Sequence, residues 1–127
     1  MMNLPDFNNL SIEPYRNRKE IIRQVAAQIE KDFAQFGLEV QFSGDMDYAY
    51  QEIFSQLKEH LIWLLDRDYH RLILLLYQID LSEKQIMTAE HSYPDVPQSD
   101  LLAELVILRE LKKVLIRNYF KDNSDKI

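Results

Sequence analysis

Glycine is almost absent from this chain, and this limits the possible folds more than any other feature of the sequence. Only Gly37 and Gly44 occur among 127 residues. Phosphate-binding loops, nucleophile elbows and dinucleotide-binding fingerprints all depend on glycine, because the backbone there must turn sharply or approach a ligand closely. The sequence therefore disfavours P-loop, Rossmann and α/β-hydrolase folds.

Apolar residues recur at three- and four-residue steps along most of the chain, the spacing that places them on one face of an α-helix. The pattern predicts five helices, over residues 16–36, 47–66, 69–79, 81–91 and 100–120. Gly37 is expected to end the first helix and Asp68 to cap the third. Asp80 and Glu83 have the spacing of a capping box for the fourth. The predicted fold class is all-α, a compact bundle of four to five helices.

The composition is that of one ordinary globular domain, with 46% hydrophobic and 28% charged residues. We expect a single helical domain over residues 16–120. A flexible N-terminal arm over residues 1–15 is expected before it, and a disordered tail over residues 121–127 after it. Residues 38–42 alternate between apolar and polar and are interpreted as a loop.

The chain has no cysteine and no long apolar run. The lack of cysteine excludes disulfides and thiol nucleophiles and suits a reducing compartment. The longest apolar run, residues 72–77, is far shorter than the ~20 residues that cross a bilayer. Residues 1–15 lack the apolar core of a signal peptide. We therefore expect a cytoplasmic protein with no membrane insertion.

Two of the predicted helices carry more apolar surface than a helix packed on one side needs. Residues 72–77 cover every side of the third helix. Apolar residues of the last helix span roughly 240°, whereas packing on one side needs little more than about 100°. Either these two helices pack against each other at the centre of the domain, or part of their surface faces another chain. The residues expected at such an interface are Trp63, Leu72, Leu76, Ile107, Leu111 and Val114.

A basic edge follows the last predicted helix, mostly at four-residue spacing. Its members are Arg109, Lys112, Lys113, Arg117 and Lys121. Such an edge can contact phosphate or an acidic partner, but cations near a helix C-terminus also complement the helix dipole. Nucleic acid is not the favoured partner, because the chain has a net charge of −6. The acidic stretch 32–66 means that the edge could equally meet a second copy of the chain.

No residue stands out as catalytic, cofactor-binding or metal-binding. The histidines, His60, His70 and His91, lack the E-x-x-H and H-E-x-x-H spacings of helical metal sites. We therefore expect no metal and no cofactor. A non-enzymatic protein is the expectation, although an enzyme using lone Asp, Tyr and His side chains on helices would leave no signature in one sequence.

Two segments of the chain carry a resemblance to known proteins. Residues 76–83 (LYQIDLSE) and 103–113 (AELVILRELKK) look like parts of a group of small helical bacterial proteins of unassigned function. The resemblance covers roughly residues 60–120. It implies a compact bacterial all-α domain and carries no functional residues.

Three functions remain open on the sequence alone. The first is a non-enzymatic interaction or structural protein that binds itself, most readily as a homodimer, or another protein. The second is a small-molecule or lipid-binding protein with a pocket between helices 69–79 and 100–120, lined by Leu, Ile and Tyr. The third is a nucleic-acid-associated protein that uses the basic edge.

Overall fold

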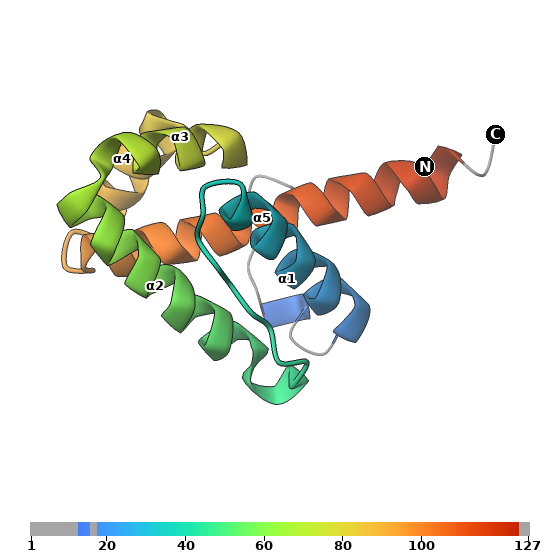
Figure 1. Ribbon diagram of the computed structural model, residues 1–127. Helices are drawn as coiled ribbons and strands as arrows, with labels where there is room; N and C mark the ends of the chain where they lie inside the picture. Colours follow the sequence, from blue (N-terminus) through green and yellow to red (C-terminus); the bar gives the residue numbers. More distant parts are fainter. Residues whose placement is uncertain (1–12, 16–17, 125–127) are drawn as a thin grey trace.

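Five α-helices make up most of the part of the chain that the structure describes, residues 13–15 and 18–124, and no strand occurs in this part (Figure 1). The structure is a computed structural model. It confirms the predicted all-α class. In chain order the elements are η1 (Glu13–Tyr15), α1 (Lys19–Ala34), η2 (Met46–Tyr48), α2 (Ala49–Arg67), α3 (Tyr69–Ile79), α4 (Glu83–Ser92) and α5 (Gln98–Ser124), where η denotes a short 3-10 helix.

The last helix, α5, makes the most extensive contacts with the other helices of the bundle. It is 27 residues long, and both α1 and α2 pack extensively against it, whereas α3 touches it only lightly (Figure 1). Packing of the last helix against helix 69–79, one of the two alternatives expected from the sequence, is therefore only a small part of its contacts. Contacts with four other helices, rather than one, account for the wide apolar surface of α5.

The core consists of the inward faces of α1, α2, α3 and α5. On α1, Val25, Ile29 and Phe33 follow one another at four-residue steps, and all three are buried. On α2, Leu57 and Leu61 are completely buried in the same way. Removing side chains of this size from water contributes about 1.5–3 kcal/mol each, so these faces supply much of the stability of the bundle.

The segment between α1 and α2 has an alternating pattern but forms no strand. Leu38 and Val40 are buried, and Glu39 between them is exposed. The amide of Gln41 donates to Oε1 of Gln56 at 2.9 Å, and Nε2 of Gln56 donates back to the Gln41 carbonyl at 2.7 Å. A side chain of α2 thus satisfies the backbone groups that a neighbouring strand would otherwise satisfy. This explains why the loop prediction holds despite the alternation.

The helix ends follow their capping residues, with one shift from the prediction. Asp68 caps α3 as expected, since its side chain accepts from the Arg71 amide at 3.1 Å. Asp80 does not open α4. Instead it closes α3 in the left-handed conformation, with φ of 66°. Ser82 and Gln85 then form the capping box of α4. Asp80 cannot serve as this cap because it already ends α3.

The ends of the predicted domain differ from its observed ends. Residues 1–12 of the predicted arm (1–15) and residues 125–127 of the predicted tail (121–127) lie outside the described residues. Within them, Glu13–Tyr15 form η1, and α5 continues to Ser124. The first helix begins at Lys19, with residues 16–17 outside the described part.

Candidate functional site

The side of α3 that faces away from the core carries four large apolar side chains. Leu72, Leu75, Leu76 and Ile79 occupy the opposite, buried side. The four outward residues, here named the α3 outer face, are Tyr69 (60% exposed), Ile73 (38%), Leu74 (44%) and Tyr77 (84%). Tyr69, Ile73 and Tyr77 are four residues apart and therefore stand in line along the helix.

The α3 outer face arises because α3 is apolar on all sides but lies at the edge of the bundle. A helix that is apolar on all sides is normally surrounded by protein. In this bundle α3 lies at the edge, where α2 and α1 pack against it from one side. The apolar residues on its other side consequently remain in contact with water. Apolar surface of this kind, gathered on one element, is typical of an interaction site.

Trp63, at the end of α2 next to α3, is 46% exposed and is held in place by Arg71. The guanidinium of Arg71 lies 5.4 Å from the centre of the indole ring, a cation–π arrangement. Arg71 also pairs with Asp68 at 3.0 Å and donates to the Phe36 carbonyl at 3.4 Å. These contacts fix the orientation of an exposed tryptophan, a residue type enriched in binding hot spots.

The structure places the six residues predicted for an interface in two groups. Trp63 is at the surface. The other five have their side chains buried within the chain itself, at 6% exposure or less: Leu72, Leu76, Ile107, Leu111 and Val114. The sequence indicates that α3 is unusually apolar. It does not indicate which side of the helix faces inward, because leucine, isoleucine and tyrosine residues occupy both sides.

The predicted basic edge is largely occupied by contacts within the chain. Arg109 pairs with the Asp80 carboxylate at 2.9 Å and donates to its carbonyl at 3.0 Å. Lys113 and Arg117 reach across to α1, where Lys113 pairs with Asp32 at 3.3 Å. Arg117 donates to Gln28 at 3.1 Å. These three cations therefore join α5 to its neighbours.

The remaining members of the edge are Lys112 and Lys121. Lys112 is half-buried and Lys121 is exposed. The acidic partner that the sequence suggested for the edge is present in the same chain, at Asp32. No second copy is needed to supply it.

A buried acidic cluster lies between α1 and α5, and the sequence analysis did not identify it. Asp32 is 3% exposed and Glu110 is completely buried. The ammonium of Lys113 lies 3.3 Å from Asp32 and 3.0 Å from Glu110. The signal that could have revealed the cluster is the position of Glu110, an acid on the apolar stripe of the last helix.

The two carboxyl groups of this cluster have pKa values moved in opposite directions. Burial and a hydrogen bond with Asp32 raise the pKa of Glu110 from 4.5 to about 8. For Asp32, burial alone raises the pKa, but the hydrogen bond from Glu110 and the charge of Lys113 outweigh it and lower the pKa below its ordinary value. Near neutral pH, Glu110 is therefore protonated and Asp32 is ionised.

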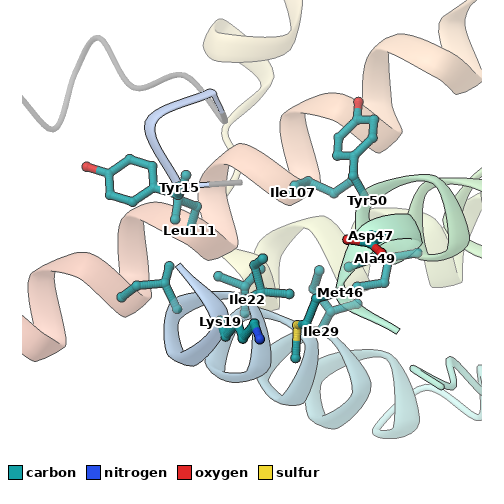
Figure 2. Close-up of a pocket in the computed structure, with 13 residues that line it drawn as sticks. Tyr15, Lys19, Ile22, Ile29, Met46, Asp47, Ala49, Tyr50, Ile107 and Leu111 are labelled. Carbon is teal, nitrogen blue, oxygen red and sulfur yellow. The ribbon is translucent and has the colours of Figure 1, made fainter. Parts of the chain in front are cut away.

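A cavity of about 420 Å³ opens between α1, the start of α2 and α5 (Figure 2). This cavity is therefore not the pocket that the sequence predicted between helices 69–79 and 100–120. The cavity exists because α1 and α2 both pack on α5 but have few contacts with each other. Its lining consists of Tyr15, Lys19, Ile21, Ile22, Val25, Ile29, Met46, Asp47, Ala49, Tyr50, Ile53, Ile107 and Leu111.

Within residues 13–15 and 18–124, no group of three or more His, Cys, Asp or Glu side chains is placed to hold a metal ion. Nε2 of His60 lies 2.7 Å from the Glu39 carbonyl, so this histidine anchors the loop between α1 and α2. Across the same described ranges, no helix is both long enough and apolar enough to span a membrane.

The fold and these sites define an all-α helical bundle with an apolar outer face and an apolar cavity. No protein-family model matches the chain, and neither a curated protein nor a solved structure matches it. Its function is therefore argued from its own residues.

Proposed function

We propose that this protein is a non-enzymatic interaction protein that binds a second copy of itself through the α3 outer face. One observation carries the proposal: Tyr69, Ile73, Leu74 and Tyr77 are all exposed along a single helix of 11 residues. Single exposed apolar residues are common on protein surfaces, but a continuous row of them is not.

Covering this surface would favour association. Covering a large apolar side chain contributes about 1.5–3 kcal/mol when burial is complete. Tyrosine is also among the residue types that dominate binding energy. Tyr77, at 84% exposure, has the most surface to lose. Trp63, already held by Arg71, lies on the neighbouring helix and adds an ordered aromatic side chain to this end of the bundle.

The charge distribution favours a second copy as the partner. Two chains with a net charge of −6 repel each other at most approaches. Helix α3, however, contains no aspartate or glutamate between Tyr69 and Ile79. Two copies can therefore meet at this helix without placing carboxylates of α3 against each other. A twofold arrangement uses the same patch on both chains, so one apolar face is enough.

The test is the association state of the protein and of three single variants. Sedimentation velocity over a wide concentration range should show the wild type with a mass of twice 15.2 kDa. Tyr77→Glu and Ile73→Glu should weaken dimerisation by about tenfold or more, because each places a carboxylate in the apolar contact.

The matched control is Ser55→Glu, which adds the same charge at an exposed position of α2, outside the α3 outer face. It should dimerise like the wild type. A wild type that is monomeric throughout, or a control as weakened as Tyr77→Glu, would reject self-association through this face. Circular dichroism checks that each variant keeps its helices.

We also propose a cellular location for the protein and a group of proteins to which it is related. The lack of cysteine supports a cytoplasmic location, and the resemblance of residues 60–120 supports a place among small helical bacterial proteins. The nucleic-acid alternative gains no support from the structure, because Arg109, Lys113 and Arg117 are engaged within the chain.

A further inference from the structure

We infer that the cavity between α1, the start of α2 and α5 binds a small single-chain carboxylate, with the hydrocarbon chain inside and the carboxylate at Lys19. This site is separate from the α3 outer face. Three observations support it: the size and lining of the cavity, the position of the charged groups around it, and the packing that leaves it open.

The size and lining of the cavity suit an apolar ligand. Its volume of about 420 Å³ is within the range of roughly 300–1,000 Å³ that small-molecule sites occupy. Nine of its lining residues are aliphatic or methionine, contributed by α1, α5 and the η2–α2 region. Such side chains offer a hydrocarbon chain close contacts and no hydrogen bonds, so the apolar part of the ligand determines most of the affinity.

The lining contains one cation and one anion, Lys19 and Asp47. Figure 2 shows them on different parts of the lining, with the labelled Met46 between them. Lys19 forms no ion pair with any residue in the described ranges, unlike Lys58, which pairs with Asp100 at 2.9 Å. An anionic head is therefore favoured at the Lys19 end and disfavoured near Asp47, which gives the ligand a direction.

The packing explains why the lining residues leave this space open. Protein interiors rarely contain voids larger than a water molecule. Here α1 and α2 are both supported by α5, so neither needs the other to bury its apolar face. At the start of α2, Ala49 lies across the cavity from Ile22 of α1 (Figure 2). Ile53 of α2 also lines the cavity.

Isothermal titration calorimetry with sodium decanoate, and separately with decanol, tests the inference. The wild type should bind both, with a negative heat-capacity change that reports apolar burial. Lys19→Gln should weaken decanoate by about threefold to fivefold, because Lys19 is exposed and water screens its charge. It should leave decanol unchanged. Loss of both ligands in this variant would instead indicate a damaged cavity and overturn the role of Lys19.

Two further variants complete the test. Ile22→Trp places a larger side chain in the cavity from a half-buried position, and it should abolish binding of both ligands while the helical content stays the same. Lys31→Gln removes an exposed lysine of α1 that does not line the cavity, and it should bind like the wild type. The inference is overturned if the wild type binds neither ligand, or if Ile22→Trp binds as well as the wild type.

Discussion

Glu110 is a carboxylic acid held in the interior of the protein between two helices. Its pKa is raised to about 8, so the folded chain keeps a proton there that the unfolded chain releases near pH 4.5. The stability that depends on this proton is fully present below about pH 4.5 and is lost as the pH rises towards 8. The slope inside this window is about 1.4 kcal/mol per pH unit. Asp32 and Lys113 are the charged groups that face it.

The variant Glu110→Gln tests this account, because glutamine has the shape of the protonated acid and cannot ionise. We expect it to unfold at a higher urea concentration than the wild type at pH 8, and at nearly the same concentration at pH 5. Its stability should therefore change less between these two pH values. Glu59→Gln, at an exposed position of α2, is the control and should follow the wild type. Equal pH dependence in all three proteins would contradict a buried proton at Glu110.

At the scale of the element, the turn that follows α1 contains Gly37 with a φ of 74°, and the Leu38 amide donates to the Phe33 carbonyl at 3.1 Å. This turn directs Leu38 and Val40 into the core. A methyl group added at Gly37 would meet no atom within 4 Å. The requirement for glycine is therefore one of backbone conformation and not of space.

Gly37→Ala should consequently lower the free energy of unfolding by about 1–2 kcal/mol, the cost of the left-handed conformation for a side chain with a Cβ. Gly37→Asn should lose less, because asparagine tolerates this conformation better. Urea denaturation measures both. A loss at asparagine as large as that at alanine would indicate a steric rather than a conformational cause.

The elements also show how much could be predicted from the sequence. Helix α3 was predicted with its observed bounds, because Asp68 caps it and its apolar residues are continuous. The cap of α4 was misplaced by two residues, because Asp80 and Ser82 both have side chains that can cap a helix. The outward side of α3 and the buried state of Glu110 depend on where α2 and α1 lie, and one-dimensional spacing contains no information on that arrangement.

At the scale of the whole molecule, the two proposed sites are at opposite ends of α2. Ala49 lines the cavity and Trp63 adjoins α3. A helix rises about 1.5 Å per residue, so roughly 20 Å separates them. Both sites can therefore be occupied at the same time without competing for any side chain.

This separation predicts that the two activities are independent. Tyr77→Glu should bind decanoate with the affinity of the wild type, and Ile22→Trp should dimerise like the wild type. Calorimetry and sedimentation velocity, each applied to the variant of the other site, provide the measurement. If either variant lost both activities, the two surfaces would be coupled or one of the variants would have lost its fold.

The position of α5 at the end of the described chain has a consequence for biosynthesis. A ribosome releases α1 and α2 before it releases the helix on which both of them pack. Until residues 102–114 have emerged, the apolar faces of the earlier helices lack their main partner and remain exposed to other nascent chains and to chaperones. The core of the bundle can therefore close only once α5 has been translated.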